Sequence, residues 1–490
     1  MTVRFGASPA PGPLAESLLR ELSEAVGADH VETDGDALTE AGQDWWPIGL
    51  VWVENGNQPA MPQAVVAPGS TAEVAAVLKA ANSAKVPVTP FGGRSGVVGG
   101  SLPVAGGISL DLRRLDKILE IDDTDLVVHT QTGVFGPELE ASLSEAGLTC
   151  GHFPQSFDIA TVGGWIACRG AGQFSNKYGK IEDLVLGLEV VLADGTAVTY
   201  APQPAAATGP DLKRLFIGAE GTLGVVTSAW LQAHPAPATQ AKRAYSFETF
   251  KDILELQRRV ARRGATPACL RGYDTGDAKL HFQRDDDRSL LIVIAEGDAA
   301  EVGRQIQVVD DELADFDAVA EDEALAERWL ENRNDVSALH EVISRGVVVD
   351  TIEIAAPWSK LPAIYSSVRT AVLNIEGTFT AVAHASHAYL SGGCLYFTFA
   401  GTAGDDPAAK DAYYNDCWET AMRAVIDGGG TISHHHGIGL NRARFMREEL
   451  GDGFAVLEAV KDALDPNGIM NPAKLGLGTS LWPGEQEMST

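Results

Sequence analysis

Apolar positions near the start of the chain follow helical spacing. Leu18, Leu22 and Val26 share one face of a helix predicted over residues 13–26. The stretch that follows is rich in Trp and Gly and shows no clear period. We therefore treat residues 1–60 as an N-terminal helical segment.

A strand–helix–strand pattern comes next. AVVAP at 64–68 predicts a strand, and Ser70 with Glu73 forms a capping-box pattern that begins a helix. VPVTPF at 86–91 predicts a second strand, which runs directly into the glycine-rich segment GGRSGVVGG at 92–100.

Strand patterns continue beyond that glycine segment. DLVVHTQTG at 125–133 predicts a strand, and a helix is expected from about Pro137. LEVVLADGTAVTYA at 188–201 predicts a hairpin with Asp194-Gly195 as a two-residue turn. Residues 61–235 are therefore expected to form one α+β domain.

The second half of the chain repeats a strand followed by a helix. Strands are predicted over 289–297, 350–358 and 394–400, with helices over 300–314, 359–374 and 407–427. Such units with neighbouring strands favour an antiparallel sheet with helices on one face. Phe454, Leu457, Val460 and Leu464 then predict a further helix.

The resulting fold class is α+β, with two larger domains between two end segments. The predicted divisions are an N-terminal segment at 1–60, a ligand-binding domain at 61–235, a substrate or cap domain at 236–430, and a C-terminal active-site and closing segment at 431–490.

Charge narrows the range of partners. The 490 residues include 67 Asp plus Glu and 37 Lys plus Arg, a formal net charge of -30. Because binding to nucleic acid or to an anionic membrane needs clustered cations, we expect neither partner. Any anionic ligand must be held by local donors.

Cysteine usage and hydropathy indicate the compartment. The five cysteines are scattered without a CxxC pair, which is typical of a reducing environment. The first residues, MTVRFGASPAPGP, lack the apolar core of a signal peptide, and no apolar run reaches the ~18 residues of a membrane span. We expect a cytoplasmic protein without a transmembrane segment.

Three glycine-rich loops offer backbone N–H groups free of Cβ obstruction. They are GGRSGVVGG at 92–100, the stretch at 154–185, and FIGAEGTLGVVT at 216–227. The first loop is neither a dinucleotide fingerprint nor a Walker A loop. Together the loops could wrap a long pyrophosphate-bearing cofactor.

Three adjacent histidines, His434, His435 and His436, lie well inside the chain in TISHHHGIGL. In an extended segment His434 and His436 would share one face, with His435 opposite, unless the following turn rotates them. A structural role, a metal site and proton transfer are all open from residue type alone.

The order and spacing of the three loops resemble the FAD-binding domain of the vanillyl-alcohol oxidase/p-cresol methylhydroxylase (PCMH-type) superfamily. The resemblance implies FAD bound along the loops, in a domain of two subdomains, with a cap domain whose antiparallel sheet is covered by helices. Some members attach the flavin through a His in the first loop. Arg94 occupies this loop and no His does, so we expect non-covalent FAD.

The cofactor-binding residues implied by this resemblance come from four stretches. They are Pro90, Phe91, Gly92, Gly93, Arg94, Ser95, Gly96, Gln155, Ser156, Phe157, Asp158, Ile159, Ala160, Thr161, Cys168, Arg169, Gly170, Ala171, Glu220, Gly221, Thr222, Leu223, Gly224, Val225 and Val226.

Two branches of the superfamily lead to different sites. The D-2-hydroxy acid dehydrogenase branch binds a divalent metal through a His-x-Gly-Asp-Gly-Asn-x-His element and a Glu-His-Gly element. Here His387 is kept, but Tyr396 stands at the second metal-binding His and His435 at the Glu. We therefore predict no metal.

The segments SHHHGIG and GGCLYFTFA instead resemble the alkylglycerone phosphate synthase family. The resemblance implies that Tyr396 donates or accepts a proton, that the histidine triplet moves a proton at the substrate, and that Arg271 matters for activity. The family exchanges an acyl chain for an alkyl chain through a flavin adduct, in ether-lipid formation.

One position departs from that family. Leu339 stands where the family has a phosphate-binding Arg, upstream of DTIE at 350–353. Arg333 or Arg345 is a candidate replacement, although neither is aligned with that position. A buried phosphate without a partner is costly, so the substrate need not carry one.

Three functions follow as hypotheses. The first is a synthase-like FAD enzyme, the second a FAD-dependent oxidase or dehydrogenase of an alcohol or D-2-hydroxy acid, and the third a flavin-binding module without catalysis. The expected substrate is a small or lipid-like molecule, and a homodimer is left open. From residue type alone, Tyr396 could be core, Arg271 could pair with Asp274, and Trp165 and Trp358 are interpreted as packing residues.

Overall fold

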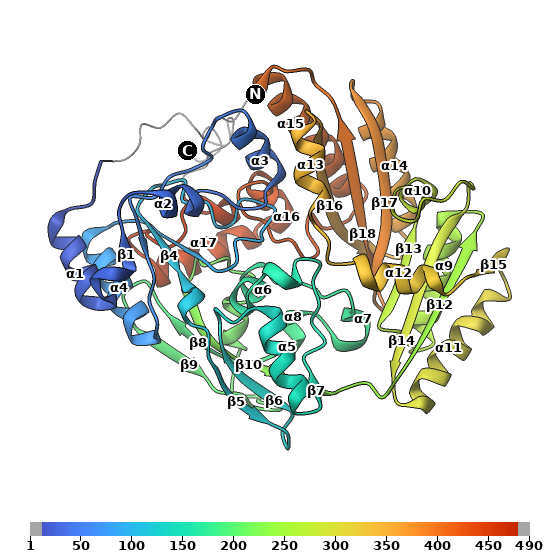
Figure 1. Cartoon of the computed structure of the whole chain (residues 1–490), viewed down its shortest axis with the longest axis horizontal. Helices are drawn as coiled ribbons and strands as arrows, with labels where there is room; N and C mark the ends of the chain where they lie inside the picture. The colour runs from blue at the N-terminus through green and yellow to red at the C-terminus, as the bar shows by residue number, and fades with distance from the viewer. Residues whose placement is uncertain (1–11, 479–490) are drawn as a thin grey trace.

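Three larger sheets, beside a two-stranded one formed by β7 (Leu148–Thr149) and β11 (His234–Pro235), organise the computed structural model, which describes residues 12–478 (Figure 1). The smallest of the three larger sheets has the order β1-β2-β4-β3, and β2, β4 and β3 run parallel. Its strands are β1 (Val31–Glu32), β2 (Ala64–Val66), β3 (Val88–Phe91) and β4 (Ile108–Asp111). The strands predicted at 64–68 and 86–91 are confirmed.

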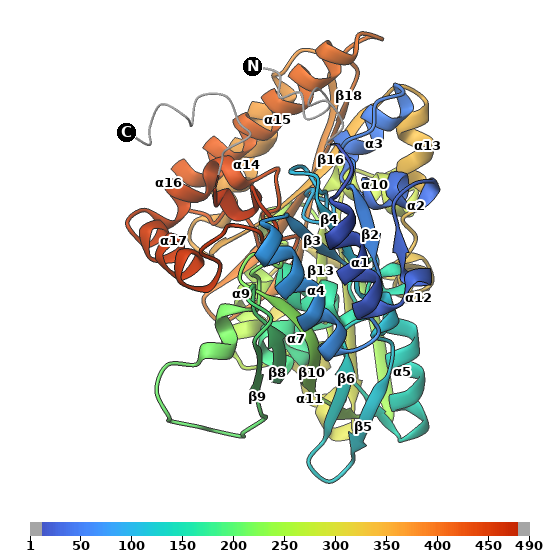
Figure 2. The same ribbon diagram turned by 90° about the vertical axis from the view of Figure 1, so that its left-hand side faces the viewer.

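Two helices lie against this sheet. α4 (Thr71–Ala84) begins where Oγ of Ser70 accepts a hydrogen bond from the Glu73 N–H at 3.2 Å, which confirms the predicted cap. α1 (Glu16–Val26) packs beside α4 through Leu18, Leu22 and Val26, as Figure 2 shows.

The second sheet is antiparallel, with the order β5-β6-β10-β8-β9. Its strands are β5 (Ile118–Asp122), β6 (Val127–Gln131), β8 (Val185–Val191), β9 (Ala197–Tyr200) and β10 (Val225–Gln232). The predicted hairpin is β8–β9, but its turn is longer than two residues, because the Leu192 N–H donates to the carbonyl of Thr196. α5 (Gly136–Glu145) and α6 (Val162–Cys168) pack on this sheet.

The third sheet has seven strands in the order β15-β12-β14-β13-β17-β18-β16, and every neighbouring pair is antiparallel. Its strands are β12 (Thr239–Phe247), β13 (Cys269–Tyr273), β14 (Ser289–Gly297), β15 (Ala318–Glu321), β16 (Val348–Pro357), β17 (Thr378–Ala388) and β18 (Gly392–Gly401). The antiparallel sheet expected in the second half of the chain is confirmed.

Helices cover both faces of this sheet, not one as expected (Figure 1). α9 (Phe250–Arg262), α11 (Ala299–Leu313), α14 (Leu361–Leu373) and α15 (Pro407–Asp427) share one apolar core. α10 (Thr275–Phe282) and α12 (Ala324–Asn332) pack on the other face. The cause is visible in β14, where Leu291 and Val293 enter the first core while Leu290 and Ile292 enter the second.

Segments from both ends of the chain join the two halves. Nε1 of Trp46, just before α3 (Pro47–Glu54), donates to Oη of Tyr414 on α15 at 2.8 Å. After α17 (Gly453–Leu464), the chain returns to the first sheet, where Met470 pairs with Val88. The remaining elements are α2 (Asp36–Ala41), α7 (Ser175–Tyr178), α8 (Ile181–Leu184), α13 (Ala338–Ser344) and α16 (Met446–Leu450).

Two further findings concern the compartment. Within residues 12–478, no helix is both long and apolar enough to cross a bilayer. The five cysteines, Cys150, Cys168, Cys269, Cys394 and Cys417, are all free thiols.

Candidate active site

A cavity of about 800 Å³ lies between the glycine-rich loops and the seven-stranded sheet. Most of the predicted cofactor-binding residues border it. They are Pro90, Phe91, Gly92, Gly93, Arg94, Ser95, Gly96, Gln155, Ser156, Ile159, Ala160, Thr161, Cys168, Gly170, Ala171, Glu220, Gly221, Gly224, Val225 and Val226.

Five residues of the predicted set do not border the cavity. Phe157, Thr222 and Leu223 are buried in the core instead, because the loops need apolar support from below. Asp158 is exposed, and Arg169 forms an ion pair with Glu182. Within each loop, some residues border the cavity, and their neighbours along the chain pack elsewhere and support the loop.

The backbone of the first glycine loop lies directly against the second loop. A Cβ on Gly92 would stand 2.2 Å from Oγ1 of Thr161, and one on Gly93 would stand 1.9 Å from the carbonyl oxygen of Ile159. Only glycine fits, so the N–H groups beside the cavity are unobstructed. This donor set fits the pyrophosphate of FAD, which backbone amides of the first and second loops would hold.

Glu220, in the third glycine-rich loop, binds the segment that follows the three histidines and holds it against the domain that carries the loops. Its carboxylate accepts hydrogen bonds from the N–H groups of Ile438 at 2.5 Å and Gly439 at 2.8 Å. Burial raises the pKa of Glu220 to about 7, while these N–H groups and the nearby Lys474 ammonium oppose the rise.

Glu353 on β16 anchors the histidines themselves. It is 0% exposed, and its carboxylate accepts from the N–H groups of His434 at 2.5 Å and His436 at 2.7 Å and from Arg442 at 2.7 Å. Burial alone would raise the pKa of Glu353, but Arg442 and the histidine segment outweigh it and hold the pKa below its ordinary value.

The histidine segment bends at residues 434–436 instead of running extended, and two of its N–H groups bind the carboxylate of Glu353. The exception allowed for the extended case therefore applies, because the bend turns His435 and His436 toward the same cavity. His435 and His436 border the cavity, and His434 is buried behind them.

All three imidazoles are neutral at pH 7. Burial and the neighbouring imidazoles lower the pKa values of His434 and His435 well below the ordinary value. Burial also lowers the pKa of His436 to about 4, although Glu353 acts in the opposite direction. His435 and His436 can therefore accept a proton at the edge of the cavity.

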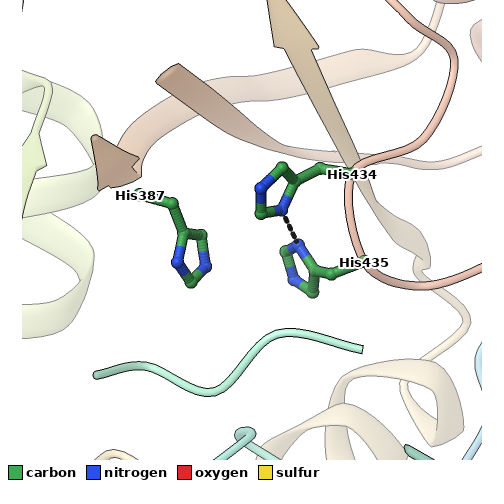
Figure 3. A group of neighbouring side chains, drawn as sticks. All are labelled: His387, His434 and His435. Atoms are coloured by element: carbon green, nitrogen blue, oxygen red, sulfur yellow. Dashed lines mark hydrogen bonds between the residues drawn. The ribbon is translucent and has the colours of Figure 1, made fainter. Parts of the chain in front are cut away.

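His387 joins two members of the triplet, and the three rings face one another in Figure 3. One ring nitrogen from each of His387, His434 and His435 lies within 4.8 Å of the others. Other partners already engage these rings, since Nδ1 of His387 lies 2.6 Å from Oγ of Ser175 and Nε2 of His434 lies 2.6 Å from Oη of Tyr389. The absence of a metal stays a prediction.

An irregularity in β17 brings His387 to the site. The pairing with β18 shifts register between Ala385 and His387, which leaves Ser386 as the extra residue. Strict alternation would place His384 and His387 on opposite faces, but with the bulge both border the cavity.

Arg271 on β13 belongs to a relay of three side chains. Its Nη2 lies 2.6 Å from Nε2 of His384, and Nδ1 of His384 lies 2.8 Å from Oδ2 of Asp277. Since a guanidinium can only donate, Nε2 of His384 accepts and its Nδ1–H donates to the carboxylate. The alternative pairing of Arg271 with Asp274 is not found, because Asp274 contacts Arg369 at 3.3 Å.

Tyr396 on β18 completes the site. Its ring stacks on His384, with centroids 4.6 Å apart, and meets His436 edge-on at 5.4 Å. Burial raises the pKa of Tyr396 above its ordinary value, so the phenol keeps its proton at neutral pH.

Sequence reasoning missed His384, Asp277 and Glu353 as parts of the site. Glu353 was visible only as the last residue of the DTIE strand, and no pattern links Asp277 to a histidine more than a hundred residues later. These are tertiary contacts between elements that are far apart in the chain.

The candidate phosphate-binding positions differ in whether they border the cavity. Leu339 and Arg333 border the cavity, whereas Arg345 pairs with Glu341 and its side chain is 71% exposed. Trp165 is buried against Phe157, and Trp358 donates from Nε1 to the carbonyl of Tyr389, so both have packing contacts.

Comparisons with known proteins agree with this architecture. A family model described as "FAD binding domain" matches residues 62–201, and one described as "FAD linked oxidases, C-terminal domain" matches residues 236–475. The uncharacterized FAD-linked oxidoreductase YgcU of Escherichia coli K12 is 34% identical over 474 residues, which cover 93% of this chain and 97% of the relative. The chain belongs to this family of FAD-linked oxidoreductases, and its cofactor is FAD.

Relatives with more specific names are more distant. Alkyldihydroxyacetonephosphate synthase of Trypanosoma brucei brucei is 28% identical, over 95% of this chain and 81% of the relative. Glycolate oxidase subunit GlcD of Bacillus subtilis is also 28% identical, over 85% and 89%. A solved alkyldihydroxyacetonephosphate synthase structure superposes with a TM-score of 0.81 at 25% identity, covering 97% of this chain and 89% of the other.

Proposed function

We propose that this FAD enzyme exchanges the acyl group of an O-acylated substrate for an alkyl group, as in the alkylglycerone phosphate synthase family. One observation carries the proposal. Tyr396, His435, His436 and Arg271 come from three separate segments and border the same cavity as the glycine-rich loops. These are the residues matched to the active site of that family.

Each side chain has a defined role in this reaction. Bound FAD supplies an electrophilic, redox-active ring. His435 or His436, as neutral imidazoles, take the proton from the substrate carbon that exchanges its oxygen substituent. Tyr396 gives its Oη proton to the departing oxygen, because its raised pKa keeps the phenol protonated.

Arg271 supplies a fixed positive charge in the proposed active site. The guanidinium stays cationic at every physiological pH, and Arg271 is held by His384 and by Oη of Tyr273 at 2.8 Å. A fixed cation beside the reacting carbon stabilises negative charge that develops there without reorganisation.

A second candidate function is oxidation of an alcohol or D-2-hydroxy acid. Leu339 at the cavity wall, in place of a phosphate-binding Arg, favours it. So does the likeness to a glycolate oxidase subunit. The same histidines would then accept the hydroxyl proton while the substrate is oxidised.

Two assays on the purified FAD-bound protein separate these functions. In the first, O-acyl dihydroxyacetone phosphate and a long-chain alcohol are supplied, and released fatty acid and the alkyl product are measured. In the second, D-lactate, glycolate and simple alcohols are added without oxygen, and the visible flavin bands are followed.

The two assays have three informative outcomes. Fatty acid release matched by alkyl product supports the exchange reaction. Bleaching of the flavin by a hydroxy acid or alcohol, without exchange, assigns the protein to the oxidase and dehydrogenase group. A protein active in neither assay, with FAD fully bound, contradicts both proposals for these substrates.

A further inference from the structure

Two arginines meet at one wall of the cavity. Both Arg271 on β13 and Arg333, just after α12, border it. Their guanidinium carbons lie 5.9 Å and 5.7 Å from the ring centroid of Trp329, so one indole contacts both cations. The chain as a whole carries a net charge of -30, which makes this local concentration of positive charge unusual.

Within residues 12–478, neither arginine touches a carboxylate directly, although Asp277 acts on Arg271 through His384. Among the described residues, no ion pair involves Arg271 or Arg333, whereas the surface Arg345 pairs with Glu341. Arg271 donates to two neutral groups, Oη of Tyr273 and Nε2 of His384. Burying a cation without a direct ion pair is costly, so two such arginines beside one cavity indicate an anionic ligand.

Arg333 has donor capacity to spare. Its Nη1 is buried and has no hydrogen-bond partner within the described part of the chain. The guanidinium lies over the rings of Phe174 at 4.5 Å and Phe153 at 5.1 Å, which hold its plane without using its N–H groups. Burial lowers the pKa of Arg333, but an arginine remains a cation at neutral pH.

The positions of both arginines are fixed by other residues. Nε2 of Gln173, on the second glycine-rich loop, donates to the carbonyl of Arg333 at 3.0 Å. Asp277 holds Arg271 through His384. Two guanidinium groups on supported backbone form a preorganised binding site, which loses little entropy when a ligand binds.

We propose that Arg271 and Arg333 together bind an anionic group of the substrate, a carboxylate or a phosphate, beside Tyr396. Val336, Leu339 and Val342 border the same cavity and offer apolar contacts to the rest of that substrate. The inference rests on the proposed function only in placing the substrate in this cavity. It holds for either reaction considered above.

The test is a binding measurement that needs no turnover. Oxalate, glycerol 3-phosphate and neutral glycerol are titrated into the FAD-bound protein, and the change in the visible flavin spectrum gives each Kd. The variants are Arg333→Leu and Arg333→Lys, with Arg345→Leu as the matched surface control. The FAD content of every variant is measured from the same spectra.

The wild type is expected to bind at least one of the two anions saturably, and glycerol far more weakly. Binding of oxalate alone selects a carboxylate, and binding of glycerol 3-phosphate alone selects a phosphate. Arg333→Leu is expected to raise the anion Kd by about 10- to 100-fold, the range for a lost charged hydrogen bond. Arg333→Lys should lose less, and Arg345→Leu should match the wild type.

Three results would overturn the inference. They are an unchanged Kd in Arg333→Leu, a wild type that binds neither anion, and a selective loss of FAD in both Arg333 variants, which would assign this residue to the cofactor. Because binding is measured directly, a protein that binds the anions but fails both activity assays refutes the proposed function and leaves the anion site standing.

Discussion

The imidazole of His384 is stacked on the phenol ring of Tyr396, with centroids 4.6 Å apart and planes inclined by 13°. The same imidazole accepts a hydrogen bond from Arg271 and donates one to Asp277. His384 therefore sets the positions of two proposed active-site residues, and Asp277 fixes its tautomer.

Asp277 should accordingly be a positioning residue. Burial would raise its pKa, but the contacts with His281 and His384 outweigh it and hold the pKa low, so Asp277 is an acceptor only. Asp277→Asn allows an amide N–H to face Nδ1, which favours the wrong tautomer of His384 and disturbs Arg271. We expect kcat to fall by about 10- to 100-fold with FAD still bound.

Asp287→Asn is the matched control, because Asp287 is 92% exposed and pairs only with Lys279 in the described structure. In the Asp277 variant, the imidazole proton resonances of His384 should also shift, which a loss of general stability does not produce. Equal kcat values for the two variants would show that the relay does not support the site.

The ion pair between Glu353 and Arg442 should dominate the stability of the histidine segment. Both side chains are fully buried, and Glu353→Gln leaves Arg442 without its counter-charge. We expect the free energy of unfolding at pH 7 to fall by about 3–5 kcal/mol, measured by chemical denaturation. Glu376→Gln, at an exposed position, should have no such effect.

The stabilisation by the ion pair between Glu353 and Arg442 should depend on pH. The folded pKa of Glu353 lies below its unfolded value, so its stabilisation is complete above about pH 4.3 and is lost as pH falls through the folded pKa. The difference in the free energy of unfolding between wild type and Glu353→Gln should therefore become smaller in acid. A difference that grows as the pH falls would contradict the assignment.

The pH dependence of activity should lack an ordinary histidine step. Of the two candidate bases, His436 has its pKa lowered to about 4, and the pKa of His435 also lies well below its ordinary value. In a Glu220→Gln background, which removes the carboxyl whose pKa is raised to about 7, we expect kcat/KM to stay level from pH 8 to about pH 5 and to fall only as the pH approaches 4. An inflection near pH 6.5, where an unperturbed His titrates, would show that the base is a solvent-exposed imidazole.

FAD should be bound without a covalent link to the first loop, where Arg94 replaces the histidine used by some members of the superfamily. Acid precipitation should leave yellow flavin in the supernatant and a colourless pellet, read by absorbance. A pellet that retains the flavin colour after washing would demonstrate a covalent bond.

The three glycine-rich loops were readable from the sequence because each is a short, distinctive run of residues. Gly92 and Gly93 are required where the first loop meets Thr161 and Ile159 of the second, and runs of glycine mark such close approaches in a sequence. The same reasoning gave the cap at Ser70 and the β8–β9 hairpin, which depend on neighbours a few residues away.

The arrangement of the histidines was not readable in this way. Their orientation depends on Glu353, eighty residues earlier, and on the bulge at Ser386 in a different strand. Likewise, Arg333 reaches the cavity only because α12 packs across the sheet, on a face that was expected to be bare. Such contacts follow from tertiary packing, which a single sequence does not encode in any short pattern.

The most direct test of the whole account is the turnover of Tyr396→Phe, measured on whichever substrate the wild type converts, with FAD content read from the visible spectrum. Tyr413→Phe is the control, because this buried tyrosine hydrogen-bonds Thr378 and does not border the cavity. The account predicts that Tyr396→Phe binds FAD fully and loses about 100-fold or more of kcat, while Tyr413→Phe keeps it. Unchanged turnover in Tyr396→Phe would contradict the proposed active site.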